Sequence, residues 1–163
     1  MSDKIKEAQI HGEHENSSYR HEDHNHDHDH GHHHHHHHHH HGGNQVIMGS
    51  AEGHLLGTMM AYTPAILPLA EMNMQLSMKD VVVFIKEHGG TPLQVKASLK
   101  DTSTTVLLNM VGSEIFHSEN AESTETDPTR VKCKLLVVAD GIDDKVLKGA
   151  LETYMGYFRD NSF

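Results

Sequence analysis

The feature that most restricts what this chain can fold into is a histidine-rich stretch near its N-terminus. Of the 20 histidines, 17 lie between residues 11 and 41, and the run His32–His41 is uninterrupted. Imidazole is polar, and residues 21–41 contain no apolar side chain that a folded core could bury. Residues 1–43 therefore cannot offset the entropy lost on ordering, and we predict that they form a disordered tail. Residues 44–163 are enough for one small domain.

A dense cluster of imidazoles is suited to binding metal ions. Neutral imidazole nitrogen is a common ligand for nickel, zinc, cobalt and copper, and histidine-rich tracts are typical of metal binding. Because a flexible tract must be ordered each time it binds, we expect weak, multiple and exchangeable sites, which suit metal storage or delivery. The pattern leaves open which of the four metals is bound. The predicted ligands are His21, His24, His26, His28, His30, His32, His33, His34, His35, His36, His37, His38, His39, His40 and His41.

Two plainer interpretations of the tract remain open. Ten consecutive histidines is a common length for a purification tag, and a low-complexity linker would bind metal only incidentally. The tag interpretation accounts for His32–His41. It does not account for residues 24–30, where histidines alternate with Asn and Asp. This mixed segment favours a natural tract.

Charge and composition restrict the partners and the compartment. The formal net charge of −10 argues against nucleic acid or an anionic membrane as the main partner and favours cations. The single cysteine, Cys133, excludes an internal disulfide and a multi-cysteine zinc site, which fits a reducing cytosol. Residues 1–4 lead into a polar segment, so we expect no secretory signal. The uncharged run 55–70 is shorter than the ~20 residues that span a bilayer and contains two prolines, so we expect no membrane span and a cytoplasmic protein.

The clearest periodic patterns after residue 44 predict two helices and two strands. Residues 92–99 alternate, with Leu93, Val95, Ala97 and Leu99 on one face and Gln94, Lys96 and Ser98 on the other. Val131–Ala139 is a second predicted strand, and Asp143–Phe158 is a predicted helix with one apolar face. A further helix is predicted to begin at Ser77, as its cap, and to end at Gly89-Gly90.

The other segments after residue 44 have patterns that are harder to interpret. We predict a short strand at 45–48, a helix at 50–62, an edge strand at 65–73 and a short helix at 106–111. Residues 116–129 lack periodicity and are predicted to form an acidic loop. His117 could there join Glu119 and Glu122 in a second metal site, although a solvated loop is the simpler interpretation.

Parts of the domain resemble a known family, the histidine-containing phosphocarrier HPr. Residues 82–87, followed by glycines and the strand 93–99, are similar to its first helix and second strand. Residues 135–144, leading into Ala150-Leu151 and Met155, are similar to its last strand, acidic turn and last helix. The resemblance implies an α+β fold of the open-faced β-sandwich type, with helices covering one face of the sheet. It also places Ser77 at the position of the family's phosphoryl-acceptor histidine, at the start of the first helix.

These patterns lead to one expected function and one alternative. No nucleophile–base pair, phosphate-binding loop, dinucleotide motif or zinc-protease motif occurs, so we do not expect an enzyme. We expect a protein that binds divalent transition metal through the tail and docks onto a protein partner through the domain. The alternative is a divergent HPr-like regulator or phosphocarrier of the phosphotransferase system, with the tail as an accessory.

Overall fold

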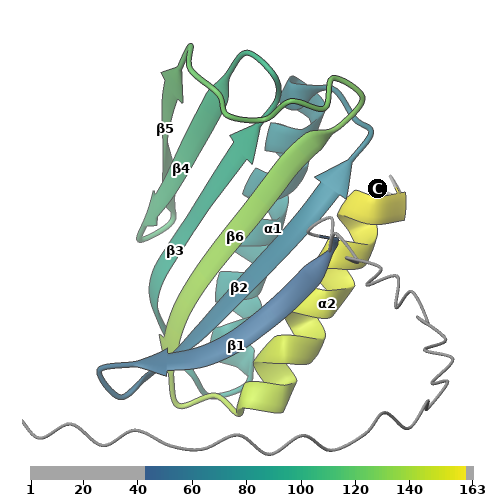
Figure 1. Ribbon diagram of the computed structural model, residues 1–163. Helices are drawn as coiled ribbons and strands as arrows, with labels where there is room; N and C mark the ends of the chain where they lie inside the picture. The colour runs from purple at the N-terminus through teal and green to yellow at the C-terminus, as the bar shows by residue number, and fades with distance from the viewer. Residues whose placement is uncertain (1–42, 161–163) are drawn as a thin grey trace, which may run out of the picture. The chain divides into compact units, whose positions relative to one another are not determined.

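The computed structural model describes residues 43–160 as an antiparallel sheet with two helices packed on one of its faces (Figure 1). The six strands lie in the order β1-β2-β6-β3-β4-β5. This confirms an α+β class with an open sheet. The histidines predicted to bind metal, His21 to His41, lie outside the described residues. The elements are β1 Gln45–Ala51, β2 His54–Thr63, α1 Leu67–Glu87, β3 Thr91–Lys100, β4 Thr105–Val111, β5 Glu114–Asn120, β6 Val131–Asp140 and α2 Asp144–Asp160.

The first two strands form a hairpin, and the helix predicted at 50–62 is wrong. Ala51 pairs with His54, so the turn consists of Glu52 and Gly53 alone. Both have positive φ, 53° and 86°, which is the backbone geometry of a tight hairpin turn whose twist matches that of the strands. From Gly57 to Thr63 every second residue of β2 is buried. This period of two outweighs the helical spacing of the leucines and methionines.

Helix α1 begins well before the predicted start, and the edge strand predicted at 65–73 is wrong. Pro68 lies in the first turn, where its missing N–H costs no hydrogen bond. The N-cap residue, Ile66, makes no side-chain cap hydrogen bond. Ser77 therefore lies in the middle of the helix and not at its start. The predicted end is confirmed, since the helix stops at Glu87 and the N–H of Gly90 bonds to the carbonyl of Ile85.

The short helix predicted at 106–111 is wrong, and the acidic loop predicted at 116–129 is wrong over its first part. Residues 105–111 form β4, which pairs with β3 on one side and with β5 on the other. The turn between β4 and β5 contains Gly112 with a φ of 63°. The sequence of β5 does not predict a strand, because its only apolar residues are Ile115 and Phe116 and they are adjacent. Only residues 121–130 form a loop.

The core lies between the sheet and the two helices. The strands predicted at 92–99 and 131–139 are confirmed as β3 and β6, and the last helix is confirmed as α2. Helix α1 packs mainly on β3 and β6, and α2 packs on β2 and β1. The largest fully buried side chains include Phe158, Met59, Met74, Met78, Ile85, Leu99, Leu108, Leu135, Leu147 and Leu151. Because both helices cover the same face, the opposite face of the sheet has no helix of residues 43–160 on it (Figure 1).

No helix within residues 43–160 has the length and apolar character needed to cross a membrane.

Candidate functional site

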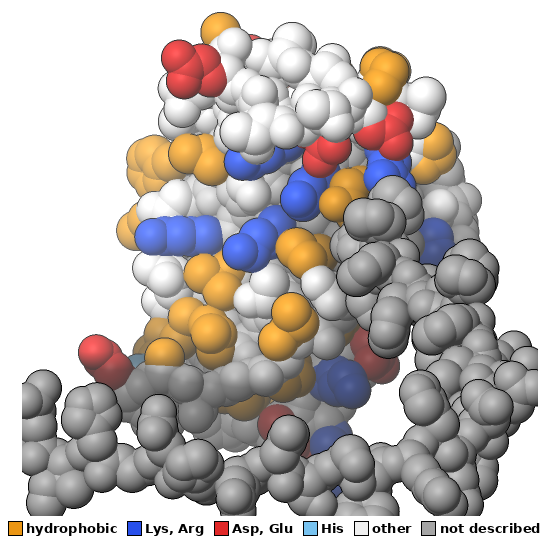
Figure 2. Space-filling model, in the orientation of Figure 1, with side chains coloured by type: hydrophobic (Ala, Val, Ile, Leu, Met, Phe, Trp, Pro, Cys, Tyr) orange, Lys and Arg blue, Asp and Glu red, His pale blue; other side chains and the backbone are white. Residues whose placement is uncertain are grey.

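The face of the sheet opposite the helices combines lysines with exposed apolar side chains (Figure 2). We call it the open face. Its members follow from the strand registers, because residues that alternate with the buried core positions point away from the helices. On the four inner strands they are Leu56, Thr58, Met60 and Tyr62 of β2, Lys132, Lys134, Leu136 and Val138 of β6, Gln94, Lys96, Ser98 and Lys100 of β3, and Thr105, Leu107, Asn109 and Val111 of β4. The same alternation also places His54 of β2 and Asp140 of β6 on this face, where they lie against each other at the end far from Tyr62. Asp140 is the one acidic residue among these positions.

Four lysines lie on the two adjacent central strands of this face. Lys96 and Lys100 come from β3, and Lys132 and Lys134 come from β6. Lys100 and Lys132 are directly opposite each other across the strand pair. Like charges in this arrangement repel. Within the described part of the chain, none of the four forms an ion pair with a carboxylate. The two central strands therefore carry a basic patch, without ion-pair partners among the described residues, on an acidic protein.

A shallow groove of about 490 Å³ crosses the open face from β6 to β5. Its apolar lining includes Leu136 in the middle of β6 and two exposed side chains, Leu107 and Phe116, which are 44% and 55% exposed. Lys96 and Lys134 also line the groove. An apolar groove with a few charged groups beside it is typical of a binding surface.

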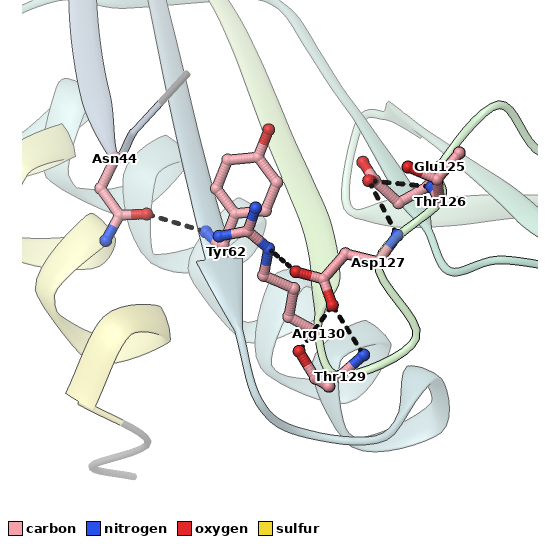
Figure 3. A network of polar contacts seen from close by, with 7 residues as sticks. All are labelled: Asn44, Tyr62, Glu125, Thr126, Asp127, Thr129 and Arg130. Atoms are coloured by element: carbon pink, nitrogen blue, oxygen red, sulfur yellow. Dashed lines mark hydrogen bonds and ion pairs between the residues drawn. The ribbon is translucent and has the colours of Figure 1, made fainter. Parts of the chain in front are cut away.

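One end of the open face carries a cation–π cluster around Tyr62, the last-but-one residue of β2 (Figure 3). The guanidinium carbon of Arg130 lies 4.1 Å from the centre of the Tyr62 ring, and the Lys132 ammonium lies 5.8 Å from it. The backbone N–H of Tyr62 donates a hydrogen bond of 2.9 Å to Oδ1 of Asn44. This bond holds Asn44 beside the basic cluster.

Asp127 orders the loop that leads into β6. Its carboxylate accepts hydrogen bonds from the hydroxyl and the backbone N–H of Thr129, and Oδ2 lies 2.7 Å from Nε of Arg130 as an ion pair. The Thr129 bonds, together with the charge of Arg130, hold the pKa of Asp127 below its usual range. Asp127 therefore stays ionised at neutral pH and holds Arg130 over the ring of Tyr62.

The three histidines of the domain are dispersed and do not meet. His54 Nδ1 lies 2.7 Å from Oδ1 of Asp140, at the opposite end of the sheet from Tyr62. His88 Nδ1 lies 2.8 Å from the carbonyl oxygen of Phe84, at the end of α1. His117 belongs to β5, and its Nε2 lies 3.6 Å from Oε1 of Glu71 on α1. Within residues 43–160 no group of three or more His, Cys, Asp or Glu side chains could hold a metal ion. The second metal site considered at His117, Glu119 and Glu122 is therefore not assembled.

Ser77 and Cys133 are both buried, so neither side chain is accessible for reaction. Ser77 is only 2% exposed and lies in the middle of α1, so its hydroxyl is not presented at a helix N-terminus. The prediction that Ser77 begins the helix, on which its match to the phosphoryl-acceptor position rested, is therefore wrong. Cys133 is fully buried, and burial raises the pKa of its thiol to about 12. The thiol is therefore inert at neutral pH.

The sequence predicts a solvent-facing side for each strand of the open face, but it does not predict which strands are neighbours. Lys96 alternates with buried residues in β3, and Lys132 and Lys134 do the same in β6. That alternation predicts a solvated face for each strand taken alone. That β3 and β6 are neighbours, which brings all four lysines together, depends on long-range pairing and is not contained in either segment.

Models of protein families, curated proteins and solved structures were all compared with this chain, and none matches it.

Proposed function

We propose that this protein binds divalent transition metal ions through its histidine-rich N-terminal segment, for storage or delivery, and that the α+β domain docks the segment onto a partner protein. The observation behind the proposal is the concentration of 17 of the 20 histidines between residues 11 and 41. Nickel, zinc, cobalt and copper all accept imidazole ligands. We propose binding rather than catalysis, because a catalytic metal centre needs a small set of ligands in a fixed geometry, whereas the segment offers many equivalent histidines.

The expected capacity and pH dependence follow from the ligands. At three or four imidazoles per ion, 17 histidines hold roughly four to six ions. Each imidazole must be neutral to bind, so binding is lost as the pH falls below about 6. The proposal places these ligands in the tract, and the domain histidines His54, His88 and His117 contribute none.

Calorimetric titration tests this proposal with a matched pair of full-length proteins. The first is the native chain, and the second has the 17 histidines of residues 11–41 replaced by asparagine. Titration of Ni²⁺ or Zn²⁺ at about pH 7.5 should give several equivalents bound by the native chain and none by the variant. At about pH 5.5 the native chain should bind little. Stoichiometric binding that survives in the variant would refute the proposal.

A second candidate function remains, a phosphotransferase-system regulator or carrier of the HPr type. It is favoured by the open antiparallel sheet with helices on one face, and by the succession of β6, the turn at Asp140-Gly141 and α2. Against it, α1 begins Leu67-Pro68 and has no histidine in its first turn, and Ser77 is buried. Incubation with a phosphotransferase-system kinase separates the two candidates. The metal-binding proposal expects no phosphorylated residue between 43 and 160.

A further inference from the structure

We propose that the open face of the sheet binds an acidic amphipathic helix of a partner protein. Carboxylates of that helix would lie against Lys96, Lys100, Lys132 and Lys134, and its apolar side chains would fill the groove beside Leu107. This inference names the partner for the docking role proposed above. It does not depend on metal binding by the tail.

The charge distribution favours an acidic occupant. The chain has a formal net charge of −10, yet the open-face positions of β2, β6, β3 and β4 carry four lysines and a single carboxylate, that of Asp140, which is paired with His54 at the far end of the face. Lys100 and Lys132 face each other directly across the β3–β6 pair, so their repulsion is relieved when an anion lies between them. The cations at this end of the face extend to Arg130 on Tyr62. A ligand with several separated carboxylates satisfies all of these positions.

The apolar groove requires the occupant to be amphipathic. Leu107 and Phe116 are exposed by about half, and the groove they line passes between the lysines of β3 and β6. A simple polyanion would leave these side chains in contact with water. A helix that presents an apolar stripe flanked by acidic residues covers the groove and reaches the lysines together. It would repeat, on this side of the sheet, the way in which α1 and α2 cover the other side.

Acidic residues around the lysines argue against a nucleic acid or a membrane surface. The loops at the Lys100 end of the sheet carry Asp101, Glu122, Glu125 and Asp127, and Figure 2 shows acidic side chains beyond the row of lysines. Asp140 lies at the opposite end, and Glu114 lies on the edge strand β5. An extended polyanion that crosses the whole face would meet these carboxylates at its borders. A short helix with a limited number of carboxylates can lie between these acidic borders, on the lysines alone.

A nuclear magnetic resonance titration of the isotope-labelled full chain tests the proposal. The probe is a synthetic helical peptide of about 18 residues with leucines at i, i+3, i+4 and i+7 and glutamates on either side of them. A chelator is present throughout, so that bound metal cannot contribute. We expect amide shift changes at Lys96, Lys134, Leu107 and Phe116, and weaker binding as salt rises. Shift changes confined to α1 and α2 would overturn the proposal.

Two pairs of substitutions give the quantitative test. Lys96→Glu with Lys134→Glu should weaken peptide binding by at least about tenfold. The matched charge reversal of two exposed helix lysines, Lys86→Glu with Lys145→Glu, should leave it unchanged. Leu107→Ser should also weaken binding, and so should replacing the peptide leucines with serine. Equal losses from both charge pairs would show a general charge effect and overturn the proposal.

Other occupants and the metal-binding role are separated by the same design. A single-stranded RNA, or vesicles containing an anionic lipid, could instead bind more tightly than the peptide and shift the amides of Lys96, Lys134, Leu107 and Phe116. That result would assign the open face to nucleic acid or to membranes and overturn the proposal. Calorimetry with Zn²⁺ reports on the tail independently. If the peptide fails to bind while the native chain still takes up Zn²⁺, the docking inference fails and the metal-binding role stands.

Discussion

Close packing of α2 on β2 at Gly57 gives a prediction that can be worked out from distances. A β-carbon placed on Gly57 would lie 2.6 Å from Cδ1 of Leu151 and 3.5 Å from Cδ2 of Leu147. Leu151 is fully buried. Gly57→Val should therefore force these leucines to shift and cost about 1–3 kcal/mol of unfolding free energy. Leu151→Ala leaves a cavity in the same place and should cost about 2–5 kcal/mol.

The double substitution should cost less than the sum of the two. Valine adds three carbons at Gly57, and Leu151→Ala removes three from the volume they would enter. We expect a favourable coupling of at least about 1 kcal/mol. Urea unfolding of the full chain, followed by far-ultraviolet circular dichroism because the chain contains no tryptophan, measures all four free energies.

A control pair uses Gly49 of β1, where an added β-carbon would meet nothing within 4 Å. Gly49→Val and Leu151→Ala should be additive within about 0.5 kcal/mol. Additivity in the Gly57 pair as well would refute the packing described between β2 and α2.

Three further predictions concern single positions. Asn73 is 3% exposed, and its Oδ1 has no hydrogen-bond partner among residues 43–160. Asn73→Leu, which is similar in shape, should therefore leave the unfolding free energy unchanged or raise it by up to about 1–2 kcal/mol. A decrease of that size, measured by thermal unfolding, would contradict the absence of a partner. Burial raises the pKa of the Cys133 thiol from 9.0 to about 12, so the unfolded chain releases this proton first and stability falls as pH rises above about 9. In Cys133→Ala the unfolding free energy should fall less steeply over this pH range, by up to about 1.4 kcal/mol per pH unit. If urea unfolding gave the same pH dependence for the native chain and for Cys133→Ala, the burial of the thiol would be contradicted. Glu52 has a φ of 53° in the β1–β2 turn, so Glu52→Asn should raise the midpoint of thermal unfolding by a few degrees, whereas Gly53→Ala, at a φ of 86°, should lower it.

The parts of the fold that the sequence predicted are those in which local pattern and long-range pairing agree. Strands β3 and β6 lie at the centre of the sheet, and α2 has one continuous apolar face. β6 alternates along its whole length, and β3 alternates from Gln94 onward. Leu93, predicted to face the core with Val95, is 48% exposed, because the register shifts between Pro92 and Gln94. In these elements the apolar positions of the sequence are largely the positions that are buried in the fold. The end of α1 was equally clear, because two glycines follow the last turn.

The parts that were mispredicted are those in which a local signal pointed elsewhere. In β2 the residues Leu55, Leu56, Met59 and Met60 have helical spacing, but pairing with β1 and β6 on both sides outweighs that preference. Pro68 was interpreted as an edge-strand residue, although the first turn of a helix accepts proline equally well. The basic patch was missed for a different reason. Its four lysines come from β3 and β6, which are separated in the chain by residues 101–130, and only the pairing of the two strands brings the lysines together.

The most direct test of the proposed division between tail and domain is a Zn²⁺ titration of the isotope-labelled full chain, observed through its backbone amides. Zn²⁺ is diamagnetic, so every amide that senses the ion is reported by a shift change. We predict changes for residues 11–41 at about pH 7.5, their loss at about pH 5.5, and unchanged signals for β1 to α2. Shifts at His117 and Glu71, or at His54 and Asp140, with the tail signals unaffected, would contradict the account by placing the metal site in the folded domain.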